Sequence, residues 1–168
     1  MATPIKFPTA EMVRERLQYK PETGEFIWIK RHQGIKLHAP AGTLHPDGRR
    51  EICIYGRRHK AARLAWLLTH GVWPTGCIDH ISGDPSDDRI ENLRDVSHSE
   101  NSQNQVRPQR SNKSSGYLGV TLSRTGKWRA RISLGNKRTL SLGAYETAEA
   151  AHQAYLEAKR KMHQGCTI

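Results

Sequence analysis

Several features that would indicate other classes of protein are scarce or missing in this sequence. Cysteine occurs three times in 168 residues, at distant positions and with no Cys-x-x-Cys pair, which argues against a disulfide framework or a zinc ribbon. No apolar run approaches the length of about 18 residues that a membrane-spanning helix needs, and no secretory leader is evident. We therefore expect an intracellular, cytoplasmic protein with no membrane partner.

Acidic and aromatic side chains are also in short supply. The chain has 16 Asp and Glu against 27 Lys and Arg, which gives a formal net charge of +11. Such an excess favours a polyanionic partner, because each neutralised phosphate releases condensed counterions. Only two Phe are present, and the Trp residues fall on apolar faces. The exposed aromatic platform of a single-stranded RNA-binding module is therefore lacking.

The charge is unevenly distributed along the chain. Residues 77–100 carry seven acidic and two basic side chains, whereas the segments on either side are strongly basic. An acidic segment opposes binding to a polyanion unless a cation lies there, and hard divalent cations can bridge carboxylates to phosphates. A solvated acidic loop is an equally good interpretation of the charge alone.

Patterns in the first 76 residues predict short scaffold elements. Thr9 is a suitable N-cap, and Val13 and Leu17 share one face, so we expect a helix from Thr9 to about Tyr19. The other expected elements are a strand over 25–29, a hairpin of 50–55 with 58–61, and a helix over 62–70 that Gly71 ends.

Residues 77–105 read as strand, loop, strand and helix in quick succession. A short strand, Ile78–His80, enters a polar loop, and a second strand follows over Asn92–Val96. The sequence Ser-His-Ser-Glu over 97–100 matches a capping box, so a helix should begin there. This places Asn101 in or near the first turn of that helix.

The C-terminal third predicts a separate small sheet with one helix. Residues 106–115 are polar and basic and read as a linker. Residues 127–132 alternate strictly, which puts Arg129 and Arg131 on the face opposite the apolar side chains. A second strand covers 139–142, and a helix that Thr147 caps should lie over the apolar face. Its apolar positions recur at helical spacing: Ala148, Ala151, Tyr155, Ala158 and Met162.

Four polar residues of the 77–101 segment suit phosphodiester hydrolysis, which needs an activated water and a cation at the scissile phosphate. Asp79 offers a hard oxygen ligand, neutral His80 can act as a general base, and Asn101 offers an uncharged oxygen. Asn92 can hydrogen-bond and fix the intervening loop. Taken singly, an Asp-His pair is more often a surface turn, and the combination carries the hypothesis.

Residues 79–104, DHISGDPSDDRIENLRDVSHSENSQN, resemble the motif of HNH homing endonucleases from phages and introns. The resemblance implies a ββα-metal fold with one divalent ion, Mg²⁺ or Mn²⁺. It also implies that Asp79 and Asn101 are metal ligands, His80 the general base and Asn92 the loop-fixing asparagine. Residues 17–74 resemble the region that precedes this motif in phage proteins.

The sequence departs from the HNH pattern at three places. Ser82 and Asp88 stand where the pattern has Asn. Neither position is a ligand by the resemblance, so activity is expected to survive, with an altered loop geometry. Upstream, the histidine that the family often carries within 60–66 is absent, and any role it has elsewhere does not transfer.

The tail from Tyr117 onwards resembles the APETALA-type DNA-binding domain, a three-stranded sheet plus one helix whose exposed sheet face enters the major groove. Leu118 and Thr121 occupy positions where the plant domains carry arginine, so the base-reading pattern cannot be transferred. From alternation and charge, the expected DNA contacts are Arg124, Lys127, Arg129, Arg131 and Arg138. Whether they read bases or hold phosphates stays open.

Together these observations predict an α+β protein with a ββα-metal nuclease domain over 1–105, a linker over 106–115 and a DNA-binding domain over 116–168. The predicted function is a site-preferring, homing-type DNA nickase that uses one divalent ion. The expected partner is double-stranded DNA, with no small-molecule cofactor, and the chain is expected to be a monomer or weak dimer. If a phage encodes it, it acts in the bacterial host cell. The alternative is a non-catalytic DNA-binding regulator on the same scaffold.

Overall fold

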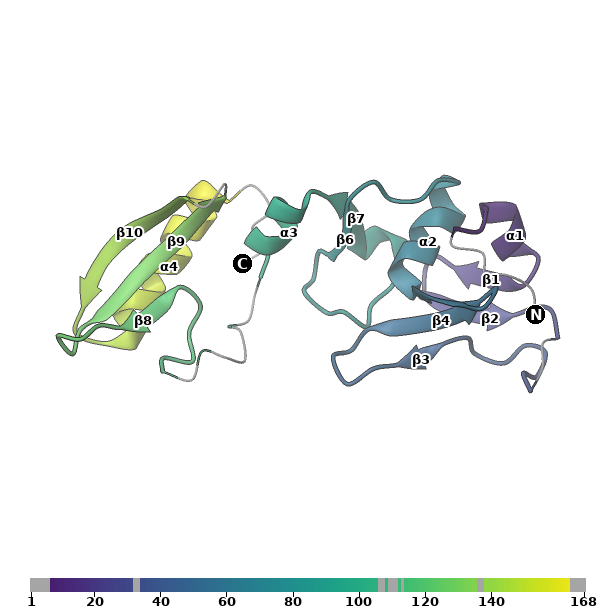
Figure 1. Ribbon diagram of the computed structural model, residues 1–168, viewed down its shortest axis with the longest axis horizontal. Helices are drawn as coiled ribbons and strands as arrows, with labels where there is room; N and C mark the ends of the chain where they lie inside the picture. Colours follow the sequence, from purple (N-terminus) through teal and green to yellow (C-terminus); the bar gives the residue numbers. More distant parts are fainter. Residues whose placement is uncertain are drawn as a thin grey trace. The chain divides into compact units, whose positions relative to one another are not determined.

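The computed structural model describes residues 7–31, 34–105, 108, 112, 114–135 and 138–163. The chain divides into two compact units, Met1–Val96 and Ser97–Ile168, and the helices and strands of both are shown in Figure 1. Each unit mixes helices and strands, in agreement with the expected α+β class. The division precedes helix α3 (His98–Gln103), so the expected domain boundary at residues 105 and 106 stays a prediction.

The first unit opens with a short helix and a hairpin. Helix α1 (Ala10–Arg14) is followed by β1 (Leu17–Lys20) and β2 (Glu25–Trp28), which pair antiparallel. The helix predicted through Tyr19 is therefore wrong beyond its first turns. Gly24, at a φ of 73°, donates its N–H to the Lys20 carbonyl and closes a tight turn. The antiparallel pairing that this turn permits gives the backbone N–H and C=O groups of β1 hydrogen-bond partners. A helix from Thr9 to Tyr19 would be only marginally stable on its own.

A small sheet and a helix form the rest of the scaffold. Strands β3 (Thr43–Leu44), β4 (Arg50–Ile54) and β5 (Arg57–Lys60) make an antiparallel sheet in that order. Helix α2 (Ala61–His70) follows, and Gly71 ends it in the left-handed conformation as expected. The predicted hairpin and helix are confirmed. The core that they share includes Ile52, Ile54, Leu64 and Leu67, each at most 2% exposed.

A second hairpin completes the first unit. Strand β6 (Cys77–His80) pairs antiparallel with β7 (Leu93–Val96), and the 3₁₀ turn η1 (Ile90–Asn92) leads into β7. Leu93 is 5% exposed and joins the same core as α2. The hairpin is therefore anchored to the scaffold at the point where its connecting loop returns to the sheet.

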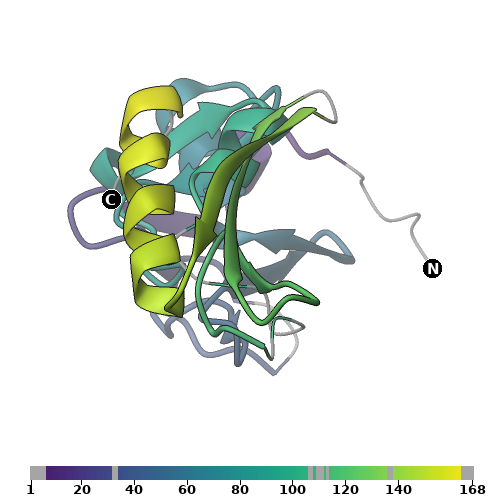
Figure 2. The ribbon, with the colours of Figure 1, turned by 90° about the vertical axis from the view of Figure 1, so that its left-hand side faces the viewer.

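In the second unit, one helix covers one face of a three-stranded sheet. Strands β8 (Val120–Leu122), β9 (Trp128–Gly135) and β10 (Arg138–Tyr145) are antiparallel in the order β10-β9-β8. Helix α4 (Ala148–Met162) packs against all three strands, and Figure 2 shows it lying along the sheet. Of the predicted linker 106–115, only residues 108, 112, 114 and 115 are among the described ones.

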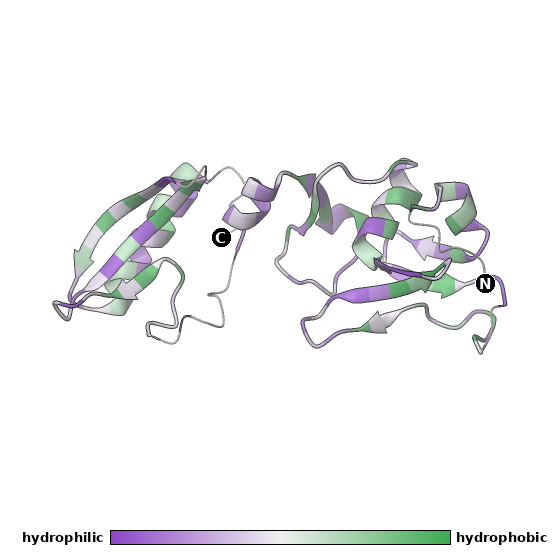
Figure 3. Ribbon diagram, viewed as in Figure 1, coloured by the Kyte–Doolittle hydropathy of each residue, from purple (hydrophilic) through white to green (hydrophobic). Residues whose placement is uncertain are grey.

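Side-chain alternation on β9 divides the sheet into an apolar and a basic face. Ala130 and Ile132 are fully buried against α4, whereas Arg129 and Arg131 are exposed. Figure 3 shows this as alternating apolar and hydrophilic bands along β9. The expected N-caps are confirmed as well, since Thr147 accepts the N–H of Ala150 and Ser97 forms a full capping box. Met162, at the last residue of α4, is 45% exposed and lies outside the apolar face.

The second unit depends on a close approach between a glycine and an aromatic ring. Gly119 has a φ of 69°, and a Cβ added there would lie 2.1 Å from the Tyr155 ring. Tyr155 is 8% exposed and packs with Leu118 and Ile132, so the ring has little room to move away.

Gly119→Ala is therefore expected to destabilise the second unit by about 1–3 kcal/mol more than Gly126→Ala, through overpacking. Gly126 is a matched control, because its φ of 78° carries similar backbone strain while nothing lies within 4 Å of its added Cβ. Urea unfolding of the full chain, followed by the amide NMR signals of β9, measures the difference. Equal losses in the two variants would contradict the steric argument.

Candidate active site

The candidate residues Asp79 and His80 lie at the end of β6, and both are buried, with exposed fractions of 7% and 6%. Asp79 faces Arg94, its cross-strand partner on β7. The Asp79 Oδ2 atom accepts a hydrogen bond from Arg94 Nε at 2.9 Å and forms an ion pair with Arg94 Nη2 at 2.8 Å. A buried carboxylate needs such a charged donor to offset its loss of hydration.

His80 has a different partner. Its Nε2 atom lies 3.2 Å from Oδ1 of Asp88, a loop residue that is only 3% exposed. The second carboxylate oxygen, Asp88 Oδ2, is buried with no hydrogen-bond partner among the described residues. Asp79 and His80 thus each contact a separate charged group, as expected for neighbours on one strand.

Asn92 holds the loop that carries Asp88. Its Oδ1 accepts the N–H of Ser82 at 2.8 Å, and its Nδ2 donates to the carbonyl of Asp87 at 2.8 Å. The backbone of Asn92 also accepts the N–H of Ile81 at 2.9 Å. One buried side chain, 6% exposed, therefore links the start of the loop to its end.

The β1–β2 hairpin supports the same loop from the other side. The Tyr19 hydroxyl donates to the carbonyl of Asp88 at 2.8 Å, and the N–H of Ile90 donates to the carbonyl of Pro21 at 3.2 Å. Burial, reinforced by the nearby carboxylates, raises the pKa of Tyr19, so its hydroxyl stays a donor. At Gly24, an added Cβ would lie 2.8 Å from the backbone of Asp88.

Sequence reasoning missed both Tyr19 and Asp88 as parts of this site. For Tyr19 no local signal exists, because its contact with the loop joins residues 69 positions apart. For Asp88 a signal was present in the departure from the HNH pattern, but that position was expected not to matter.

Most carboxylates of the acidic segment accept hydrogen bonds from nearby donors. Hydrogen bonds from Arg89 lower the pKa of Asp87, and Arg89 also pairs with Glu91 at 2.7 Å. Donors from Ser86 lower the pKa of Asp84, so this exposed carboxyl is ionised at neutral pH. Across the hairpin, Asp95 accepts the N–H groups of residues 75 and 76 at 2.7 and 2.8 Å. These contacts order the hairpin, which stays net negative, with seven acidic and two basic side chains over residues 77–100.

The two expected metal ligands belong to different units of the chain. Asp79 lies on β6, whereas Asn101 lies half-buried on α3 of the second unit. Across the described part of the chain, His, Cys, Asp and Glu side chains nowhere gather in a group of three or more that could hold a metal ion. A cation that keeps several water ligands, as Mg²⁺ does, is compatible with so few protein ligands.

The five expected DNA contacts are all exposed. Arg124, Arg129 and Arg131 line a hollow of about 410 Å³ next to the β8–β9 turn. Lys127 differs from these three, because its Nζ forms an ion pair with Glu146 at 2.8 Å. Arg138 lies at the start of β10.

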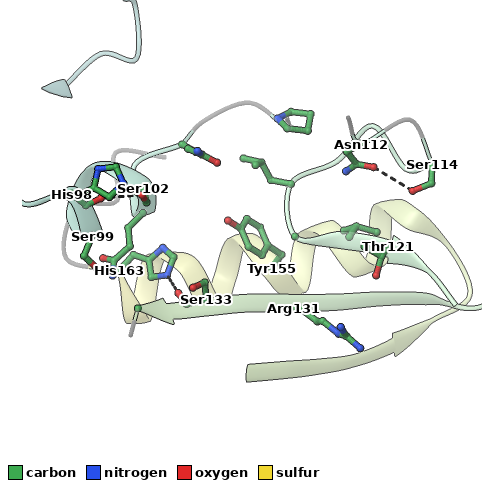
Figure 4. Close-up of a pocket in the computed structure, with 17 residues that line it drawn as sticks. His98, Ser99, Ser102, Asn112, Ser114, Thr121, Arg131, Ser133, Tyr155 and His163 are labelled. Atoms are coloured by element: carbon green, nitrogen blue, oxygen red, sulfur yellow. Dashed lines mark hydrogen bonds between the residues drawn. The ribbon is translucent and has the colours of Figure 1, made fainter. Parts of the chain in front are cut away.

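A larger cavity, of about 870 Å³, lies within the second unit and contains none of the expected catalytic or metal-binding residues. It is lined in part by His98, Ser102, Tyr155 and His163, shown in Figure 4. His163 Nε2 contacts the carbonyl of Ser133 at 2.7 Å, while its Nδ1 has no partner among the described residues. Among the described residues that line the cavity, none carries a carboxylate that could bind a hard cation.

Comparison with known proteins gives one match. A model of the HNH endonuclease family matches residues 59–103, a region that includes α2, the β6–β7 hairpin and α3. This short match supports an HNH nuclease, with DNA as its substrate. No curated protein and no solved structure matches the chain. Within the described ranges, no helix is both long enough and apolar enough to cross a membrane.

Replacing Asn92 with Ala is expected to open the loop, because Ser82 N–H and the Asp87 carbonyl would lose their shared partner. Leaving such groups unpaired costs about 1–3 kcal/mol, which corresponds to a rise of roughly 5- to 150-fold in amide exchange at Ser82. The N–H of Thr75, bonded to Asp95 at the other end of the hairpin, serves as the internal control. If both amides accelerated equally, the effect would be global unfolding and the local role of Asn92 would be refuted.

Proposed function

We propose that this chain is a metal-dependent DNA endonuclease of the homing type that nicks one strand of a duplex. The observation that carries the proposal is the position of His80 at the end of β6, next to Asp79 in the sequence and within the region matched by the HNH endonuclease model. A single such site per chain cuts one strand, so a double-strand break requires two chains or two events.

The two proposed ligands suit a hard divalent cation. Asp79 and Asn101 would hold the ion through a carboxylate and an amide oxygen, the ligand types that Mg²⁺ and Mn²⁺ accept. Arg94 occupies one oxygen of Asp79, so a cation on this carboxylate shares it with the guanidinium or binds the other oxygen. When bound, the ion supplies positive charge at the scissile phosphate.

The chain's own contribution to hydrolysis is the base. The free nitrogen of neutral His80 takes a proton from water as the water oxygen bonds to phosphorus. The bond between phosphorus and the 3′ oxygen breaks, and that oxygen leaves with the electron pair and takes a proton from solvent. The products are a 5′ phosphate and a 3′ hydroxyl. Asn92 acts by keeping the loop in place beside the imidazole.

The basic surfaces supply duplex binding. Arg129 and Arg131 lie on the sheet face that α4 leaves open, and Arg124, in the β8–β9 turn, lines a hollow with both of them. Arg138 lies at the start of β10. We infer that this sheet holds DNA in the manner of the APETALA-type domain, with Lys127 contributing once it leaves Glu146. In the first unit, strand β5 adds three exposed cations, Arg57, Arg58 and Lys60, that form no ion pair with a described residue.

A supercoiled plasmid incubated at low salt with Mg²⁺ or Mn²⁺ is expected to become open-circular, and EDTA should prevent this. His80→Ala should slow nicking by about 10²–10⁴-fold, the usual contribution of a general base. His70→Ala is the matched control, because His70 is exposed at the end of α2. This variant should nick at the wild-type rate. A plasmid carrying the gene's flanking DNA provides a candidate target. Tight binding without nicking on every plasmid and metal would instead support the non-catalytic regulator.

The double variant Arg129→Ala/Arg131→Ala is expected to weaken duplex binding in EDTA and to lower the dependence of log K on log salt by about 2, since each phosphate contact contributes about 0.9. Arg160→Ala/Lys161→Ala removes the same charge from α4, away from the open sheet face, and should leave that slope nearly unchanged. Fluorescence anisotropy at several salt concentrations measures both. Equal slopes for the two variants would exclude the sheet as the DNA-binding face.

A further inference from the structure

Asp88 is the most deeply buried carboxylate near the candidate base. Only 3% of it is exposed, and its Oδ1 lies 3.2 Å from His80 Nε2. Arg89, the next residue, directs its guanidinium to Asp87 instead. The contact with His80 is the one ion pair or hydrogen bond that the described residues give to the Asp88 carboxylate, because Oδ2 has no partner.

The backbone of Asp88 is fixed on two sides, so its carboxylate has a defined position. The Tyr19 hydroxyl binds its carbonyl, and Gly24 approaches its backbone so closely that an added Cβ would lie 2.8 Å away. Asn92 closes the loop by binding the carbonyl of the preceding residue, Asp87. Such over-determination is unusual for a surface loop.

We propose that Asp88 is a positioning residue that sets the tautomer of His80. A carboxylate can only accept, so the hydrogen at the 3.2 Å contact resides on His80 Nε2. The lone pair of the neutral ring is then on Nδ1, and Nδ1 is the nitrogen that takes the proton from water. The inference rests on the proposed nuclease function for its purpose, while the tautomer itself is a property of the free protein.

The chemistry of the side chain explains why a carboxylate has this effect. An asparagine at the same place could accept from Nε2 through its oxygen or donate to it through its NH₂ group, and the second arrangement would favour a proton on Nδ1. A carboxylate excludes that alternative. Burying it with a single partner costs free energy, and strained or costly groups of this kind cluster at functional sites.

The test is ¹⁵N NMR of the histidine rings in the free, metal-free protein at a pH of about 8, where ordinary imidazole is neutral. The His80 signals are assigned by their loss in His80→Gln. We expect a protonated Nε2 and an unprotonated Nδ1 in the wild type. In Asp88→Ala the two nitrogens should move towards the mixture of tautomers found for a ring in water. A proton on Nδ1 of the wild type, in a neutral or a charged ring, would overturn the proposal.

A matched pair of amide variants covers the case in which Asp88→Ala fails to fold. Asp88→Asn and Glu91→Gln both exchange a carboxylate for an amide in the same segment, but Glu91 is exposed and contacts Arg89. We expect Asp88→Asn to alter the His80 signals and Glu91→Gln to leave them unchanged. Wild-type spectra in both variants would refute the positioning role.

The kinetics of nicking distinguish a positioning role of Asp88 from a role in packing alone. We expect kcat for nicking to fall about 10²-fold or more in Asp88→Ala and less in Asp88→Asn, with KM for DNA unchanged, because Asp88 is too buried to contact the duplex. A rise in KM with an unchanged kcat would refute the inference. A wild type that shows the expected tautomer but never nicks would contradict the proposed function alone.

Discussion

The side-chain amide of Asn92 ties the first residues of the β6–β7 loop to its last ones, and the surroundings of His80 depend on that tie. An amide suits the position because it offers a donor and an acceptor at once, one for the Asp87 carbonyl and one for the Ser82 N–H. Because the loop is closed, Asp88 lies close to the end of β6, and its Oδ1 contacts His80 Nε2. A carboxylate or a hydrocarbon side chain could satisfy only one of these groups or neither.

Residues 77–100 include an acidic hairpin in a protein with a net charge of +11. Arg94 and Arg89, the two basic residues between 77 and 100, each bind carboxylates of the hairpin itself. These pairs fix the positions of the charges, while the segment stays net negative, with seven acidic and two basic side chains. Cations that form no ion pair with a described residue include Arg57 and Arg58 on β5 and Arg129 and Arg131 on the open face of β9. The proposed function therefore places the attraction for DNA and the cleavage chemistry on different surfaces.

Sequence patterns predicted those features whose causes are local. The caps at Ser97 and Thr147 and the stop at Gly71 depend on side chains within one helical turn, and each was found where expected. The first helix was predicted too long, because Leu17 fits both a helical face and a strand, and only the pairing with β2 decides between them. The contact of Asp88 with His80 also escaped prediction, since burial of a loop carboxylate is decided by residues distant in the sequence.

The support that the β1–β2 hairpin gives to Asp88 has a consequence for how such a site can evolve. The region matched by the HNH model begins at residue 59, whereas Tyr19, Pro21 and Gly24 hold its loop from outside that region. Because these contacts come from outside the matched region, transferring residues 59–103 alone to another scaffold would remove the support of the loop that carries Asp88. A change at the Gly24 turn and a change in the loop affect the same contact, so each limits which substitutions the other tolerates.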